Sequence, residues 1–191
     1  MHIATHAMLS WLLAEAAPAA RHDRRARAAI TLAGMAPDLD GLGAPVEILS
    51  RGALPWFSQY HHTLMHNGLA CLVVAVLAWA WCRRDARVLV MALLAGHVHL
   101  VCDVLGARGP DGHDWPIPYL APFSMWEWRW SGQWALNAWP NIVVTAAAML
   151  AIAWLGARRG RTPVEIVHPG LDARIAARLQ ARWGGAGRTG R

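Results

Sequence analysis

The sequence predicts an all-α membrane protein, a multi-pass helical membrane bundle of about five helices with three clear spans and two shorter N-terminal helices. The 191-residue chain is 55% hydrophobic and only 16% charged, whereas an average soluble domain carries about 25% charged residues. Its apolar residues gather in runs of helical length, and no stretch alternates as a half-buried strand does. This composition also excludes a disordered chain, which needs low hydrophobicity and high charge.

The predicted helices fall into two groups. Two shorter apolar helices are expected near residues 3–20 and 26–36. Because about 20 apolar residues cross a bilayer, three later runs qualify as spans, at residues 62–82, 86–106 and 138–157. The cleanest of the three is the last, which contains no ionisable residue.

These helices define a membrane-embedded domain over residues 1–157. Residues 158–191 form an arginine-rich tail, which we expect to be partly disordered. Within the tail, a short amphipathic helix is predicted around residues 171–183, followed by a disordered Gly-rich end at 184–191.

Arginine supplies all 18 basic residues, and three clusters lie at the ends of apolar runs, at residues 21–27, 83–87 and 158–161. If the helices run up and down in order, these clusters share one side of the membrane, which the positive-inside rule makes cytoplasmic. We therefore expect a cytoplasmic C-terminal tail and the lipid bilayer as partner. Because no basic stripe interleaves with aromatic residues, the net charge of +6 does not indicate nucleic-acid binding.

Ionisable residues inside apolar helices are costly and mark function by default. His99 and Asp103 are four residues apart and share one face of a predicted helix. His62 and His66 have the same spacing, and His61 converges with them only at or before the start of that helix. A histidine and a carboxylate at this spacing can hold one divalent metal ion.

Three further candidates lie on the same side of the predicted topology. Asp38 and Asp40 follow the second helix, and each can bind a metal or orient a ligand histidine. His6 begins the first helix. The topology is derived from the arginine positions without using the histidines and aspartates. All the candidate ligands nevertheless lie at its outer end, so we expect a metal site towards the outer face. Histidine and carboxylate ligands suit zinc first, with manganese or iron as alternatives.

The motifs also occur in a characteristic order along the chain. In sequence they are Thr5-His6, Pro37 to Asp40, His61 to Asn67, His99 to Asp103, and Pro122 to Ser124. Over about residues 1–157 this order resembles the bacterial family of predicted membrane-bound metal-dependent hydrolases, which is distantly similar to zinc-dependent phospholipases C. The resemblance implies a bacterial inner-membrane location and metal-dependent hydrolysis.

This chain departs from the family pattern at the histidine block, residues 61–67. Many members have His-Arg-Gly-x-Thr-His-Ser where this chain has His61-His62-Thr-Leu-Met-His66-Asn67. The family pattern implies His61 and His66 as ligands, whereas helical spacing pairs His62 with His66. Both choices therefore stay open.

Together these inferences predict an enzyme, a metal-dependent hydrolase in which a divalent metal makes water a nucleophile at neutral pH. The expected metal ligands are His6, Asp38, His61, His62, His66, His99 and Asp103. Asp38 and Asp40 are the expected catalytic carboxylates, with Asp40 as general base or as orienter of a ligand. A site at the bilayer surface indicates a lipid or lipid-linked ester or phosphoester substrate. The alternatives are a metal-ion or proton-coupled transporter and a structural membrane protein; nothing in the sequence sets an oligomeric state.

Overall fold

The computed structural model describes residues 1–18, 20–109 and 112–183. Helices are the regular elements among these residues and no strand forms, which confirms the all-α prediction. The two shorter N-terminal helices are α1 (Ile3–Ala16) and α2 (Arg24–Met35). The predicted disorder of residues 184–191 lies outside the described part of the chain.

Two helices are long and apolar enough to cross a membrane, α6 (Ala86–Gly106) and α7 (Trp139–Arg159), each of 21 residues. The third predicted span, at residues 62–82, forms only the 14-residue α5 (Gly68–Trp81). At about 1.5 Å per residue, α5 is roughly 21 Å long, shorter than the ~30 Å hydrocarbon core of a bilayer. Three clear spans are therefore not confirmed.

Asn67 explains why α5 begins late. Its side-chain oxygen accepts a hydrogen bond from the backbone N–H of Ala70 at 2.8 Å, which caps the helix. Its amide nitrogen donates to the carbonyl oxygens of Thr63 and Leu64 at 3.1 and 3.0 Å. The histidine block therefore lies in a turn stabilised by this side chain, and only the purely apolar residues after it form the helix.

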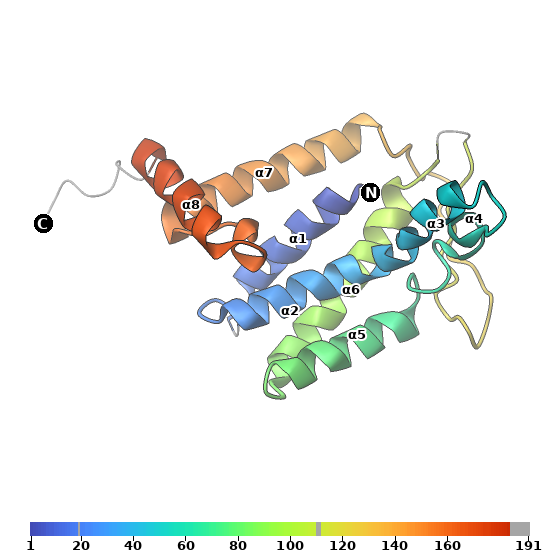
Figure 1. Ribbon diagram of the computed structural model, residues 1–191, viewed down its shortest axis with the longest axis horizontal. Coiled ribbons are helices and arrows are strands. Elements are labelled where there is room, and N and C mark those ends of the chain that lie inside the picture. The colour runs from blue at the N-terminus through green and yellow to red at the C-terminus, as the bar shows by residue number, and fades with distance from the viewer. Residues whose placement is uncertain (19, 110–111, 184–191) are drawn as a thin grey trace, which may run out of the picture.

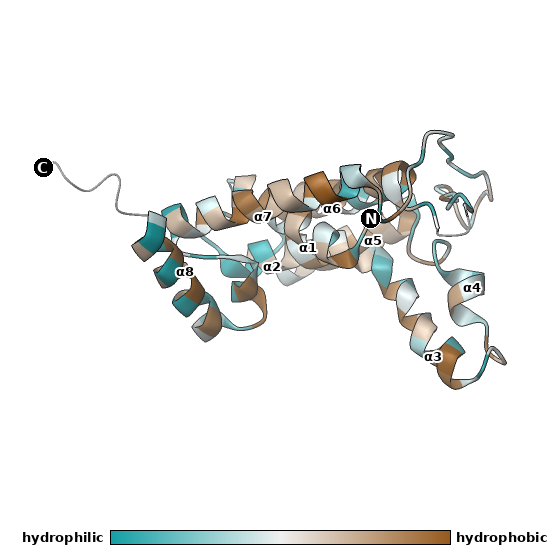
Figure 2. Cartoon of the chain, turned by 90° about the horizontal axis from the view of Figure 1, so that it is seen from above, coloured by the Kyte–Doolittle hydropathy of each residue, from teal (hydrophilic) through white to brown (hydrophobic). Residues whose placement is uncertain are grey.

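Helices α2, α5 and α7 run roughly along the longest axis of the molecule, and α6 crosses it obliquely (Figure 1). Helix α2 packs between α1 and α6, α5 packs on α6, and α7 packs on α1. The N-terminus lies at one end of this bundle, beside the short helices α3 (Gly43–Leu49) and α4 (Trp56–Tyr60), which project from it in Figure 2. Helix α8 (Pro169–Trp183) lies at the opposite end.

Small side chains allow this close packing. The main buried cluster is rich in alanine, for example Ala14, Ala33, Ala75, Ala92 and Ala95, and small residues let helix backbones approach one another in membrane proteins. The turn between α1 and α2 and the turn between α5 and α6 contribute to this same cluster. The arginine clusters flanking those turns therefore share one end of the bundle, as the up-and-down order predicts.

Gly34 marks the closest approach of α1, α2 and α6. A Cβ atom at this position would lie 2.0 Å from Ser10 Oγ and 3.1 Å from the side chain of Ala95. No larger residue fits there without a shift of a helix. This contact sets the position of the last turn of α2, from which the chain continues into the 3₁₀ helix η1 (Ala36–Leu42).

The C-terminal segment folds back onto the bundle. Helix α7 ends at Gly160, whose φ of 70° is the left-handed conformation that glycine adopts readily. The 3₁₀ helix η2 (Pro163–Ile166) and then α8 follow, and α8 packs against α7. The predicted tail helix at 171–183 thus begins two residues earlier than expected.

Candidate metal centre

Four potential metal ligands meet at the end of the bundle opposite α8. Asp38, His66, His99 and Asp103 each offer one ligand atom, and these four atoms lie within 4.8 Å of one another. They come from η1, from the turn before α5 and from α6. Segments separated in sequence therefore supply a single compact group of imidazole and carboxylate atoms.

His99 and Asp103 form the part of this group that lies on α6. His99 Nε2 is 3.1 Å from Asp103 Oδ2, and both side chains are buried. His99 Nδ1 donates a hydrogen bond to the carbonyl oxygen of Gly34 at 2.7 Å. Because the Nδ1 proton is used in this way, Nε2 of the neutral ring carries the lone pair that faces the cluster.

His66 is held in the same manner by a carboxylate. Its Nδ1 donates to Asp40 Oδ2 at 2.9 Å. Its Nε2 lies 3.3 Å from His99 Nε2 and 3.4 Å from Asp103 Oδ2. Two imidazole nitrogens that face each other at this distance need a cation or a proton between them, since two lone pairs repel.

Asp38 and Asp40 point in different directions because a 3₁₀ helix turns about 120° per residue. Asp38 Oδ1 lies 3.6 Å from His99 Nε2 and 4.0 Å from His66 Nε2. Its Oδ2 is buried and has no hydrogen-bond partner within the described residues. Asp40 instead accepts hydrogen bonds from His61 Nδ1 at 2.7 Å and from the backbone N–H of Met65 at 3.3 Å.

The carboxylates set the protonation of the histidine block. Burial opposes a charge on His66, but its hydrogen bonds with Asp103 and Asp40 outweigh burial and raise its pKa to about 9. Burial would raise the pKa of Asp40, yet hydrogen bonds from His61 and His66 hold it well below its usual range. Burial, reinforced by the charge of His66, lowers the pKa of His62 well below its usual value.

This donor set fits a divalent metal ion. Two imidazole nitrogens and two carboxylates are ligands typical of zinc, manganese and iron. The unpaired, buried Oδ2 of Asp38 is a second indication, because buried carboxylate oxygens normally have partners. Asp40 and the Gly34 carbonyl accept hydrogen bonds from the Nδ1 atoms of His66 and His99, which orients the two rings with Nε2 towards the cluster, as is usual for histidines that bind metals.

His61 and His62 lie beside this four-residue group. His61 stacks on Phe57 with ring centroids 4.4 Å apart, and with Asp40 and His66 it forms a second group of potential ligands. The ring of His62 stacks on that of His66 at 4.2 Å, and its buried Nδ1 has no partner among the described residues. The helical spacing used to pair His62 with His66 does not apply, because His62 is in a turn with a φ of 65°.

His6 contacts the cluster through Asp103. Its Nε2 lies 3.1 Å from Asp103 Oδ1, and its ring stacks on His99 with centroids 3.7 Å apart. The N-terminal amine of Met1 contacts the same carboxylate oxygen. Sequence patterns could not predict a role for that amine or for the Gly34 carbonyl, because every residue has a carbonyl group and only the fold brings these two atoms to the site.

Comparisons with known proteins place the chain among membrane proteins. A family model described as YdjM inner membrane protein matches residues 1–171. This match covers all the segments that form the cluster and extends into the first residues of α8. Searches of curated proteins and of solved structures find no match.

Proposed function

The chain belongs to the YdjM inner membrane protein family, and we propose that it is a membrane-bound metal-dependent hydrolase. Its substrate would be a lipid or a lipid-linked ester or phosphoester. The observation that carries the proposal is the convergence of Asp38, His66, His99 and Asp103 within 4.8 Å. Buried ionisable residues in a membrane protein are retained at a cost, which favours a functional role.

In this proposal Asp38, His66, His99 and Asp103 hold a divalent metal, zinc first and manganese or iron as alternatives. When bound, such a metal lowers the pKa of water towards ~7 and polarises a carbonyl or phosphoryl oxygen. His6 orients Asp103 through the contact of its Nε2 with Oδ1, while its ring stacks on that of His99.

The two aspartates of η1 take different roles. Both oxygens of Asp40 are occupied by His61, His66 and Met65, so Asp40 positions His66 and is not free to take up a proton from water. Asp38 is partly exposed, with 16% of its side chain accessible, and its Oδ2 has no partner among the described residues. Asp38 is therefore the carboxylate suited to accept a proton during hydrolysis.

The surroundings of the histidine block favour a lipid substrate. An apolar groove of about 390 Å³ lies beside it, between α5 and the loop that follows α6. Leu64, Met65, Val73, Ala121 and Met125 are among its lining residues. An acyl chain in this groove would lie next to the turn that carries His66. We propose that this end of the bundle faces the outer side of the inner membrane and that the arginine end faces the cytoplasm.

The test combines metal content with activity in the purified protein. Metal per chain is measured for the wild type, for His66→Ala and for Asp103→Ala. His22→Ala, an exposed histidine near the other end of the bundle, is the matched control. Hydrolysis of phospholipids and lipid esters is assayed on the same samples. We expect metal and activity to fall together in the two cluster variants and to persist in the control.

Two outcomes would contradict the proposal. Unchanged metal content in both cluster variants would show that His66 and Asp103 do not bind the metal. Stoichiometric metal with no hydrolysis of any membrane lipid, together with metal flux into liposomes, would indicate a transporter instead.

A further inference from the structure

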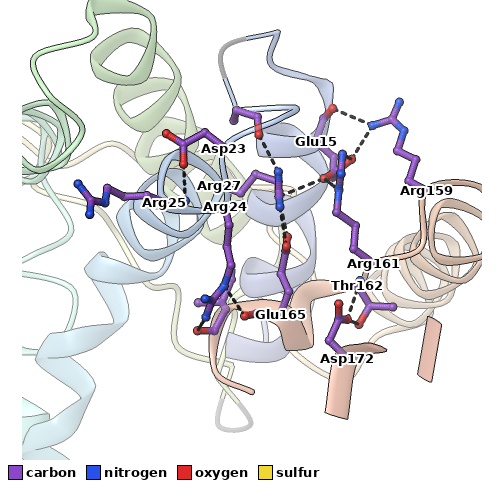
Figure 3. Close-up of polar contacts among 12 residues, drawn as sticks. Glu15, Asp23, Arg24, Arg25, Arg27, Arg159, Arg161, Thr162, Glu165 and Asp172 are labelled. Atoms are coloured by element: carbon purple, nitrogen blue, oxygen red, sulfur yellow. Dashed lines mark hydrogen bonds and ion pairs between the residues drawn. The ribbon is translucent and has the colours of Figure 1, made fainter. Parts of the chain in front are cut away.

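The arginine end of the bundle contains a buried ion network (Figure 3). Glu15, at the end of α1, is 1% exposed. Its carboxylate accepts hydrogen bonds from Arg159 Nη1 at 2.5 Å and from Arg161 Nε at 2.6 Å. These contacts join α1 to the residues that end α7 and begin the C-terminal segment.

A second carboxylate completes the network. Glu165 in η2 accepts hydrogen bonds from Arg27 Nε and Nη2, both at 2.6 Å, and from Trp11 Nε1 at 3.2 Å. Arg27 also lies 3.3 Å from Glu15. Arg27, Arg159 and Arg161 thus each contact a buried carboxylate, which offsets two of their three positive charges, and these contacts fix the C-terminal segment to α1 and α2.

The arginines of α8 are not balanced in this way. Arg174, Arg178 and Arg182 follow one another at intervals of four residues, so they share one face of the helix. All three are exposed, and none pairs with an acidic side chain in the described ranges. Like charges at this spacing destabilise a helix, so an anionic partner would relieve their repulsion.

The acidic residue of α8 faces the other way. Asp172 is buried and accepts hydrogen bonds from the backbone N–H and the hydroxyl of Thr162 at 2.8 and 2.6 Å. Ala176 is also buried, and Leu179 reaches Gly156 of α7. The inner face of α8 is therefore covered by the bundle, whereas none of the described residues covers its arginine face.

Two exposed tryptophans lie at the same end of the bundle, on the side of α8 that faces α7. Trp154 of α7 and Trp183 of α8 are 58% and 54% exposed and line one apolar groove between the two helices. Arg158 lies over the ring of Trp154, 5.6 Å from its centroid. Tryptophan and arginine together are typical of segments at the interface between membrane and water, where the rings enter the headgroup layer.

We propose that α8 lies on the surface of an anionic leaflet, with Arg174, Arg178 and Arg182 bound to the phosphates of acidic phospholipids such as phosphatidylglycerol. Charge complementarity identifies the occupant, since this face carries three positive charges that have no acidic partner among the described residues. The ion network holds this face in a fixed orientation relative to α7. The proposal concerns the end of the bundle away from the His/Asp cluster and does not depend on hydrolysis.

The test reports the position of α8 in the full chain. Ala181, exposed on α8, is changed to cysteine and labelled with a nitroxide, while the three native cysteines are buried. The protein is placed in nanodiscs of phosphatidylcholine, with and without phosphatidylglycerol. Accessibility of the label to a water-soluble relaxation agent is then measured. We expect protection in the anionic discs, and its loss at high salt.

Two matched variants separate the arginine face from net charge. Replacing Arg174, Arg178 and Arg182 with glutamine should abolish the protection. Replacing Arg25, Arg83 and Arg84, which are exposed at the same end but outside α8, removes equal charge and should leave it intact. Metal content and gel-filtration behaviour check that each variant is folded.

Three results would overturn the proposal. The first is equal accessibility of the label in neutral and anionic discs. The second is protection that survives in the α8 variant. The third is strong binding of a labelled RNA that the α8 variant alone loses, which would identify a polyanion other than lipid as the ligand of this face.

Discussion

His66 and Asp40 form a buried histidine–carboxylate pair, with His66 Nδ1 2.9 Å from Asp40 Oδ2. The pair connects two segments that are 26 residues apart, the 3₁₀ helix η1 and the turn before α5. It turns Nε2 of the ring towards His99 and Asp103. A carboxylate behind a ligand histidine fixes the ring and raises its basicity, so the pair bears directly on metal affinity.

Asp40→Asn should weaken metal binding without abolishing it. The amide replaces a charged acceptor with a neutral one, and loss of such a partner typically costs 10- to 100-fold in affinity. Titration against a competing chelator measures the change. Asp114→Asn, an exposed aspartate in the loop after α6, serves as control and should have no effect. Loss as complete as in Asp103→Ala would instead make Asp40 a ligand.

Metal affinity should rise with pH through the neutral range. The pKa of His66 is raised to about 9 in the metal-free protein, so the ring is protonated at neutral pH and must lose a proton when a metal binds. Each pH unit below that value should lower affinity by up to about tenfold, and the dependence should flatten above it. Isothermal titration in buffers of different ionisation enthalpy counts the released proton. Affinity independent of pH would contradict this assignment.

The residues of the cluster differ in how well sequence alone could place them. His99 and Asp103 meet because both lie on a helix whose bounds, 86–106, were predicted correctly, so the i, i+4 rule applies. His62 and His66 have the same spacing but lie in a turn, because Asn67 caps α5 only after the block has ended. The hydrogen bond of the Asn67 side chain with the Ala70 N–H therefore determines that residues 62–66 form a turn and not the first turn of α5.

The individual ion pairs between distant segments at the arginine end could not be predicted from the sequence. The clustering of arginines indicated one shared end of the bundle, and the packed turns agree with it. Nothing in the sequence showed that Glu15 would pair with Arg159 and Arg161, more than a hundred residues away. Such pairs depend on helix packing, which periodicity does not describe.

Gly34→Ala should destabilise the bundle and disturb the metal site together. The added methyl group would lie 2.0 Å from Ser10 Oγ, so α2 must move away from α1, and overpacking of this kind costs about 1–3 kcal/mol. The same shift moves the carbonyl oxygen that holds His99. Thermal unfolding in detergent and metal titration measure the two effects.

Ser10→Gly should partly rescue this variant, because it removes both of the nearest atoms. Gly170→Ala is the control, since a methyl group there would meet only the His168 ring at ordinary contact distance. If Gly34→Ala lowered stability while the rescue had no effect, contact with Ser10 would not be the cause.

Arg27→Met should destabilise the protein by about 3–5 kcal/mol, because it leaves the buried carboxylate of Glu165 without its arginine partner, whereas Glu15 keeps Arg159 and Arg161. Arg25→Met on the exposed face of the same helix should change stability by less than about 0.5 kcal/mol. The double variant Arg27→Met with Glu165→Met should cost less than Arg27→Met alone, since the unpaired charge of Glu165 is removed. Chemical unfolding of all four proteins provides the measurement, and equal losses for Arg25 and Arg27 would contradict it.

The ion network also joins residues that are synthesised at very different times. Glu15 and Arg27 leave the ribosome long before Arg159, Arg161 and Glu165, with which they pair over 138 to 146 residues. At bacterial elongation rates this interval is on the order of ten seconds. During that time the first two helices have only their mutual contact to offset their charges. The ion pairs of α1 and α2 are therefore completed only when the C-terminal segment arrives, and a chain truncated before η2 would lack the partner of Arg27 in η2.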